Sequence, residues 1–147
     1  MSNPLKVAIA GLGTVGAGTV DLLAQQAAVI EDRAGCPIEV TAVSARDKNK
    51  DRGVDIGGMA WFDDAVKMAS EADADVVVEL IGGSDGPAKA ACEAAFNAGR
   101  HIVTANKALL AHHGVELAQM AEQAGKSLQF EAAVAGGIPI IKSLREG

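Results

Sequence analysis

A glycine-rich turn near the amino terminus carries the strongest chemical signal in this sequence. Gly11, Gly13 and Gly16 form the spacing GxGxxG, directly after an apolar segment and directly before a helix-like pattern. In such a turn the first glycine allows a tight bend and the second lets a diphosphate approach the main chain. The third glycine lets the helix pack close to the strand. The spacing and its context therefore predict a dinucleotide-binding turn.

The first residues of the helix after this turn supply the groups that would hold phosphate. The N–H groups of Thr14 and Val15 have no partner inside a helix that begins there, and they lie at its positive end. A diphosphate is stabilised at such a place. The alternative is a strand-to-helix turn that binds no ligand.

A second candidate lies where the predicted strand over residues 38–45 ends. At this place a carboxylate favours NAD through the ribose 2′-OH, whereas an arginine accommodates the 2′-phosphate of NADP. Here Arg46 comes first and Asp47 follows, with Lys48 and Lys50 close behind. This order is compatible with NADP, or with use of both cofactors. The alternative is a charged loop that is merely solvated.

Two later segments also follow predicted strands. Gly82 and Gly83 come after the apolar run 75–81, where glycines would let the main chain pass close to a ribose or nicotinamide; a plain turn is the alternative. Lys107 opens a predicted helix, where the positive end of the dipole disfavours an ammonium group. We therefore expect Lys107 to donate a hydrogen bond to a substrate or cofactor oxygen, with an ordinary exposed lysine as the alternative.

These residues need a scaffold that brings strand ends together, and the hydrophobic pattern predicts one. Strand-like and helix-like segments alternate along the chain, which is typical of a parallel sheet with right-handed crossovers. The expected fold is α/β, a Rossmann-type doubly wound parallel sheet with helices on both faces. The predicted strands are residues 5–10, 38–45, 75–81, 101–104 and 127–134; the predicted helices are 14–30, 62–70, 87–98, 106–124 and 140–145, and residues 46–58 are expected to form a loop.

Composition restricts the possible functions. The 147 residues suit a single domain, and 13 basic against 19 acidic side chains give a net charge of −6. An acidic chain without a basic cluster is not expected to bind nucleic acid or an anionic membrane. No signal peptide or membrane span is evident, so a cytoplasmic location is expected. Cys36 and Cys92 lack metal spacing and are expected to be small buried side chains.

Four motifs together resemble the N-terminal part of homoserine dehydrogenase. They are GLGTVG, ELIGG, TANKALL and EAAVAGGIPIIKSLREG, and the resemblance extends over essentially the whole chain. It implies the reversible NADPH- or NADH-dependent reduction of L-aspartate 4-semialdehyde to L-homoserine, on the route to threonine, methionine and isoleucine. The alternatives are another NAD(P)-dependent amino-acid or semialdehyde dehydrogenase, and a non-catalytic NAD(P)-sensing module.

The resemblance also implies roles for particular residues. The cofactor would lie on Leu12, Gly13, Thr14 and Val15, with Arg46 near the adenosine ribose. Lys107 would act beside the nicotinamide and the substrate. A sodium ion would be held by one carboxylate and main-chain oxygens, which map onto Glu131, Val134, Gly136 and Ile138.

The family further implies a substrate and dimerisation domain after Gly147, which this sequence does not contain. The full-length protein is then expected to be a homodimer or homotetramer. A cofactor-binding domain alone is expected to bind dinucleotide weakly and to turn over little substrate.

Overall fold

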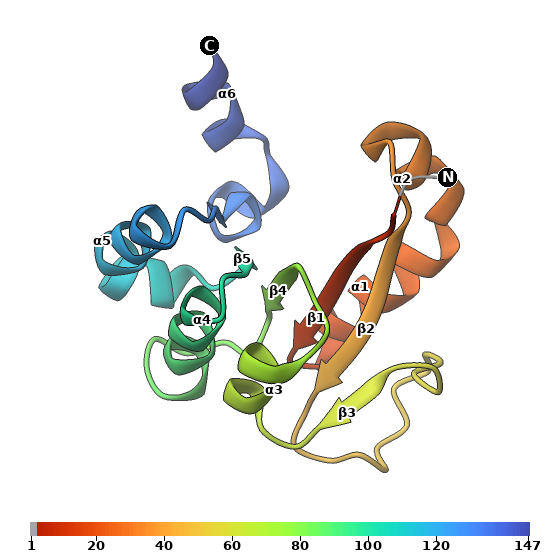
Figure 1. Cartoon of the computed structure of the whole chain (residues 1–147). Helices are drawn as coiled ribbons and strands as arrows, with labels where there is room; N and C mark the ends of the chain where they lie inside the picture. Colours follow the sequence, from red (N-terminus) through yellow and green to blue (C-terminus); the bar gives the residue numbers. More distant parts are fainter. Residues whose placement is uncertain (1–2) are drawn as a thin grey trace.

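Six parallel strands make up the sheet of this protein in the computed structural model, which describes residues 3–147 (Figure 1). The spatial order is β3-β2-β1-β4-β5-β6. The chain therefore steps outward in one direction from β1 to β3, and then crosses back to β4 on the other side of β1. This reversal creates a crevice at the carboxyl ends of β1 and β4, where ligands bind in open α/β sheets. The bounds are β1 (Leu5–Ala10), β2 (Ile38–Ser44), β3 (Ala60–Phe62), β4 (Val76–Glu79), β5 (His101–Thr104) and β6 (Leu128–Gln129).

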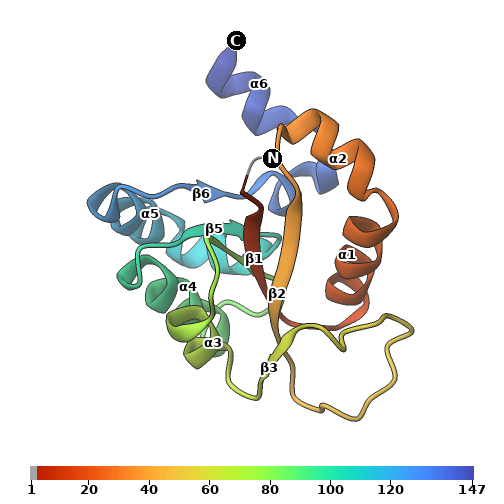
Figure 2. The same ribbon diagram turned by 45° about the vertical axis from the view of Figure 1, so that its right-hand side comes forward.

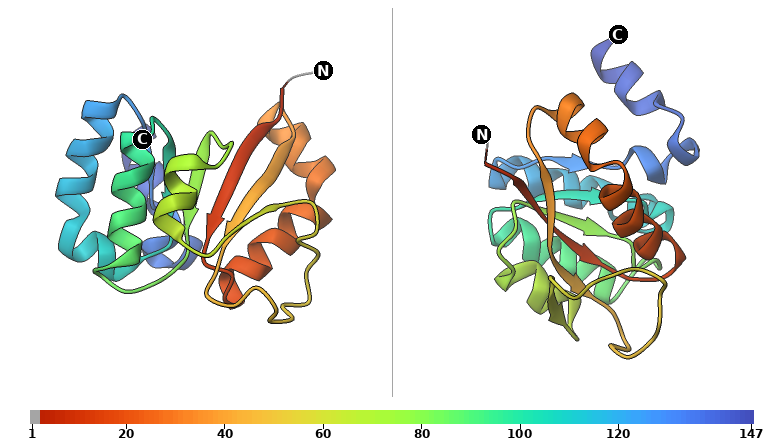
Figure 3. Two further views of the ribbon diagram at one scale, coloured as in Figure 1. Left: turned by 60° about the horizontal axis from the view of Figure 1, so that its bottom comes forward. Right: turned by 90° about the vertical axis from the view of Figure 1, so that its right-hand side faces the viewer.

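Helices lie against both faces of the sheet, as the left panel of Figure 3 shows. One face is covered by α3, α4 and α5, and the opposite face carries α1 and α2. The predicted doubly wound α/β architecture is therefore confirmed. The helices are α1 (Thr14–Gln25), α2 (Ala27–Ala34), α3 (Ala65–Glu71), α4 (Pro87–Asn97), α5 (Lys107–Ala124) and α6 (Ile140–Glu146), with short 3-10 turns η1 (Glu131–Ala133) and η2 (Ala135–Gly137) before α6.

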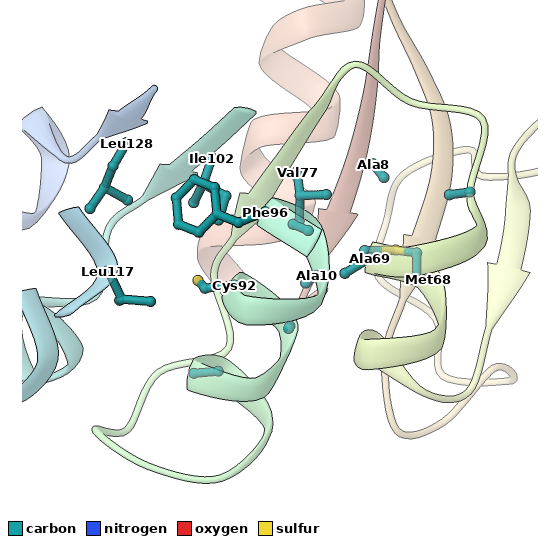
Figure 4. Close-up of a cluster of buried hydrophobic side chains, with 14 of the residues drawn as sticks. Ala8, Ala10, Met68, Ala69, Val77, Cys92, Phe96, Ile102, Leu117 and Leu128 are labelled. Atoms are coloured by element: carbon teal, nitrogen blue, oxygen red, sulfur yellow. The ribbon is translucent and has the colours of Figure 1, made fainter. Parts of the chain in front are cut away.

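The core has two parts because side chains of a strand alternate between the faces of the sheet. In β1, Ala8 and Ala10 face the larger apolar cluster, whereas Val7 and Ile9 belong to a smaller cluster with Leu12 and Val20. Strand β1 is thus covered on both faces, as expected for the centre of a parallel sheet. The larger cluster, drawn in Figure 4, includes Met68, Val77, Cys92, Phe96, Ile102, Leu117 and Leu128.

The two cysteines differ in their surroundings. Cys92 is fully buried in the larger cluster, and this burial raises the pKa of its thiol to about 12. Cys36 is only partly buried and forms no disulfide. The expectation of a small buried side chain therefore holds for Cys92 and only in part for Cys36.

The helix expected over residues 14–30 is interrupted at Gln26, which ends α1 and precedes α2. Few side chains of this region are buried. Only Gly16 and Val20 are buried in α1, and no residue of α2 is buried. Helix α1 packs on the turn through Gly16 and on the smaller core cluster through Val20, so several other large side chains remain outside. Val15, Leu22 and Val29 are 60%, 56% and 47% exposed.

Three further boundaries differ from the predicted ones. Strand β3 was not expected; it spans three residues at the sheet edge and pairs only with β2. Its presence shortens the helix expected at 62–70 to α3. The strand predicted over 127–134 is reduced to β6, because the chain turns into η1 and η2 directly afterwards.

No helix within residues 3–147 is both long and apolar enough to cross a bilayer.

Candidate functional site

The glycine turn lies at the reversal point of the sheet, between the end of β1 and the start of α1. Gly11 has φ +100°, and a Cβ atom there would lie 2.6 Å from the carbonyl oxygen of Leu80. A Cβ atom on Gly16 would lie 1.8 Å from the carbonyl oxygen of Gly11. Both positions therefore require glycine, and α1 packs main chain against main chain on the turn.

Gly13 differs from its two neighbours in the motif because it has open space around it. A Cβ atom on Gly13 would meet no heavy atom within 4 Å. This residue caps α1 without a side-chain hydrogen bond. The N–H groups of Thr14 and Val15, which open the helix, are therefore available to an anion. A phosphate has both room and hydrogen-bond donors at this helix start.

A cleft of about 400 Å³ opens beside the helix start. One wall is the turn with the first part of α1, and the other is the loop over residues 45–59, which Figure 2 shows passing close to that turn. Its volume lies within the range of small-molecule sites, ~300–1,000 Å³. The lining residues are Leu12, Gly13, Thr14, Ala17, Gly18, Asp21, Lys50, Asp51, Arg52, Gly53 and Val54.

Arg52 holds this loop against the glycine turn and was not singled out from the sequence. Its Nε donates to the Leu12 carbonyl oxygen at 3.1 Å, and its terminal nitrogens donate to the carbonyl oxygens of Asp47 and Lys50. The guanidinium also lies 5.5 Å from the centre of the Trp61 ring. The basic character of the loop was visible in the sequence, but a contact across 40 residues was not.

Arg46, the predicted reader of the ribose phosphate, is exposed just beyond the end of β2. It is absent from the lining of the cleft, whereas Lys50 and Arg52 of the same loop contribute to it. The loop residues that lie beside the glycine turn are therefore residues 50–54, and Arg46 is not among them.

The ends of β4 and β5 are joined by hydrogen bonds to the carboxylate of Glu79. This side chain is fully buried. Its Oε1 accepts from the N–H groups of Ile81 at 2.7 Å and Gly82 at 3.3 Å. Its Oε2 accepts from the Thr104 hydroxyl at 2.6 Å. The carboxylate thus contacts the loop after β4 and the last residue of β5 at once.

Asn106 closes this network from the β5 side. Its N–H donates to Thr104 Oγ1 at 3.0 Å, and its Oδ1 accepts from the N–H of Leu109 at 3.1 Å, which caps α5. Its Nδ2 donates to the carbonyl oxygen of Gly83 at 2.6 Å. Gly82 and Gly83 have φ values of +83° and +84°, so the loop adopts a shape that glycine allows.

Lys107 is the first residue of α5 and follows this network directly. Its side chain is exposed, and among residues 3–147 it has no hydrogen bond or ion pair. The ammonium group is therefore available to an oxygen atom at the carboxyl edge of the sheet, an arrangement that fits both the expected hydrogen-bond role and the alternative of an ordinary exposed lysine.

A charged cluster flanks the same loop on its outer side. His113 Nε2 lies 2.9 Å from Asp85 Oδ1, and His113 Nδ1 lies 3.6 Å from Glu116 Oε2. The hydrogen bond from His113, with a second from Ser84, holds the pKa of Asp85 below its ordinary value. The cluster links α5 to the turn that precedes α4.

The segment expected to hold a cation has other contacts here. The two carboxylate oxygens of Glu131 accept from the N–H groups of Ile141 at 3.1 Å and Lys142 at 3.2 Å, at the start of α6. The Ile138 carbonyl oxygen accepts from the N–H of Ile140 at 2.7 Å. Val134 and Gly136 lie between them, Gly136 with φ +61°. In the described part of the chain, no three His, Cys, Asp or Glu side chains are grouped as metal ligands.

The sheet order, the reversal point and the open helix start together define a dinucleotide-binding domain of the Rossmann type. Comparison with known families then identifies the particular group. Residues 11–131 match the family model described as homoserine dehydrogenase, NAD binding domain. The chain belongs to the homoserine dehydrogenase family and covers its NAD-binding part.

Individual relatives agree with this assignment. The homoserine dehydrogenase of Pseudomonas aeruginosa is 48% identical over 99% of this chain, which covers 33% of that protein. The crystal structure of a homoserine dehydrogenase from Thiobacillus denitrificans is 43% identical, with a TM-score of 0.86 over 99% of this chain and 33% of that one. The Staphylococcus aureus enzyme at pH 7.5 is 35% identical, with a TM-score of 0.81 over 91% of this chain and 34% of that one. This chain thus spans about a third of the length of these relatives.

Proposed function

We propose that this chain is the cofactor-binding part of a homoserine dehydrogenase, which reversibly reduces L-aspartate 4-semialdehyde to L-homoserine with NADPH or NADH. The observation that carries the proposal is the uncapped start of α1 beside Gly13, at the reversal point of the sheet. The family relationship and the names of the relatives support the reaction and the substrate.

In this proposal Gly11, Gly13 and Gly16 shape the turn, and the N–H groups of Thr14 and Val15 hold the diphosphate. The buried Leu12 side chain anchors the turn in the smaller core cluster. The bound cofactor would supply the hydride chemistry. Gly82 and Gly83 would let the main chain approach the nicotinamide end.

Lys107 is the proposed catalytic residue of this chain. Its exposed ammonium at the carboxyl edge could donate a hydrogen bond to an oxygen of substrate or cofactor. Such a charged hydrogen bond contributes roughly 1.5–3 kcal/mol. The residues that bind the amino-acid part of the substrate, and the remaining proton donor, are proposed to lie in a substrate and dimerisation domain after Gly147. The full-length protein is proposed to be a cytoplasmic homodimer or homotetramer.

The cofactor preference is proposed to favour NADP. Arg46 lies two residues after the end of β2, and Lys50 and Arg52 line the adjoining cleft. These three basic side chains could receive a 2′-phosphate, whereas no carboxylate occupies the last position of β2. Binding of NADH as a second cofactor remains part of the proposal, because Asp47 follows Arg46.

A sodium site on Glu131, Val134, Gly136 and Ile138 is also proposed from the family resemblance. Hard oxygen donors suit such an ion. In this structure, however, the Glu131 carboxylate caps α6, so a cation would have to share it. Calorimetric titration with NaCl against KCl, repeated with Glu131→Gln, tests the site. Equal heats for both salts and both proteins would rule it out.

Two experiments test the main proposal. Titration calorimetry of this chain with NADPH and NADH should show binding, tighter for NADPH; the absence of binding by both would refute the cofactor assignment. In a chimera, this chain would replace the corresponding third of the Pseudomonas aeruginosa enzyme. Homoserine-dependent reduction of NADP supports the dehydrogenase function, whereas a folded chimera that binds NADPH without turnover favours a sensing module.

A further inference from the structure

Glu79 is a buried charge in a strand that is otherwise apolar, and its partners are all neutral. It accepts hydrogen bonds from two main-chain N–H groups and one hydroxyl, and it has no ion pair among residues 3–147. Burying a carboxylate costs free energy even when it is hydrogen-bonded, and an apolar side chain of similar size would fill this place at less cost. The contacts of Glu79 therefore indicate a role other than core packing.

The first group of atoms that Glu79 holds is the main chain after β4. Its Oε1 binds the N–H groups of Ile81 and Gly82, directly before the two glycines with positive φ. Glycine has little intrinsic preference among backbone conformations, so Gly82 and Gly83 do not by themselves fix the conformation of this loop. The carboxylate supplies a fixed acceptor that selects one shape.

The second group is the start of α5. The Thr104 hydroxyl donates to Glu79, and its oxygen accepts from the N–H of Asn106. The side-chain amide of Asn106 donates in turn to the Gly83 carbonyl oxygen. These hydrogen bonds form a network that connects the loop after β4 with the segment after β5. Lys107 comes next in the chain, so the same network fixes its Cα position.

We propose that Glu79 is a positioning residue for the nicotinamide end of the cofactor site. Through Thr104 and Asn106 it fixes the relative placement of the Gly82–Gly83 main chain and of Lys107. The inference rests on the proposed cofactor function. In that function the glycine turn holds the diphosphate, and Glu79 orders the groups that contact the nicotinamide end.

The test compares two ligands that differ only at that end. NADPH carries the nicotinamide, and 2′-phospho-ADP-ribose lacks it. In Glu79→Gln the amide oxygen can still accept from Ile81 and Gly82, but the amide N–H would face a Thr104 oxygen that already accepts from Asn106. The hydroxyl proton then has no acceptor. We expect NADPH affinity to fall about tenfold, as for one charged hydrogen bond, with unchanged affinity for 2′-phospho-ADP-ribose.

A second pair of variants keeps the test valid if Glu79→Gln does not fold. Thr104→Ser retains the hydroxyl and should bind NADPH like the parent, whereas Thr104→Val should lose NADPH affinity selectively. The control is Arg100→Met. Arg100 directly precedes β5, at the amino ends of the strands, and it caps the end of α3 through the carbonyl oxygens of Met68, Ala69 and Ala72. It should lower the unfolding temperature without changing the affinity for either ligand.

The possible outcomes separate the two proposals. A parent chain that binds neither ligand overturns the cofactor function and this inference together. A parent chain that binds both ligands equally well leaves the cofactor function standing and overturns the role of Glu79. The same role is overturned if Glu79→Gln and Thr104→Val weaken both ligands equally or neither of them.

Discussion

Replacing Gly13 with alanine should remove cofactor binding and leave the fold intact. The backbone of Gly13 is extended, with φ −73° and ψ −163°, and a Cβ atom there meets no heavy atom within 4 Å. Alanine lowers the entropy of the unfolded chain, which stabilises by roughly 0.4–1 kcal/mol, but it is a poorer helix cap than glycine by a similar amount. The free energy of unfolding should therefore change by less than about 1 kcal/mol.

The loss of binding should be much larger than the change in stability. The added methyl group would occupy the space through which a phosphate reaches the N–H groups of Thr14 and Val15. Each charged hydrogen bond contributes roughly 1.5–3 kcal/mol, so loss of both costs about 3–6 kcal/mol. This corresponds to at least about a hundredfold increase in Kd.

Titration calorimetry with NADPH and urea unfolding, made on the same protein samples, measure the two quantities. Gly114→Ala is the matched control. Gly114 lies inside α5, where a Cβ atom would make ordinary contact with Leu110 at 3.8 Å. This control should gain about 1 kcal/mol of helix stability and bind NADPH normally. An unchanged Kd for Gly13→Ala would show that phosphate does not approach this turn.

Three further predictions concern single side chains. Arg46→Ala should weaken NADPH binding far more than NADH binding in calorimetry; equal losses would show that Arg46 does not contact the 2′-phosphate. Because burial raises the pKa of Cys92 to about 12, iodoacetamide at about pH 8 should modify Cys36 in the native protein and spare Cys92 until unfolding, as judged by mass spectrometry. Early labelling of Cys92 would contradict the burial. Because a hydrogen bond from His113 lowers the pKa of Asp85, the stabilisation from this pair is present above the unfolded-state pKa of Asp85 and is lost as the pH falls through its folded-state pKa. His113→Gln should raise the pKa of Asp85 in an NMR titration, and an unchanged titration would refute the link.

Periodicity and strand-end chemistry predicted most of the fold. The strand pattern gave the central sheet and its helices because parallel strands buried on both faces are nearly continuous apolar runs, as in β1 and β4. The glycine turn was predictable from spacing because Gly11 and Gly16 each meet a local steric demand, while Gly13 leaves room for a ligand. A Cβ atom on Gly11 or Gly16 would come too close to a main-chain carbonyl oxygen, so no larger residue fits at either position.

The remaining features depend on contacts between distant segments. Strand β3 is too short to show a period, and its pairing with β2 decides its structure. The close approach of α1 to the turn at Gly16 is a contact between main chains, which no side-chain period records. The hydrogen bonds of Glu79 to Thr104 and of Arg52 to Leu12 connect residues 25 and 40 positions apart.

The guanidinium of Arg52 is bound entirely by neutral carbonyl oxygens and an aromatic face, with no ion pair within residues 3–147. Its charge is therefore not neutralised, although the chain as a whole carries a net charge of −6. The lining of the cleft, however, also contains Asp21 and Asp51, which formally offset the charges of Lys50 and Arg52, so the guanidinium acts on an anion only at short range. Recognition of an anionic phosphate in this cleft should therefore depend on direct contact rather than on long-range attraction.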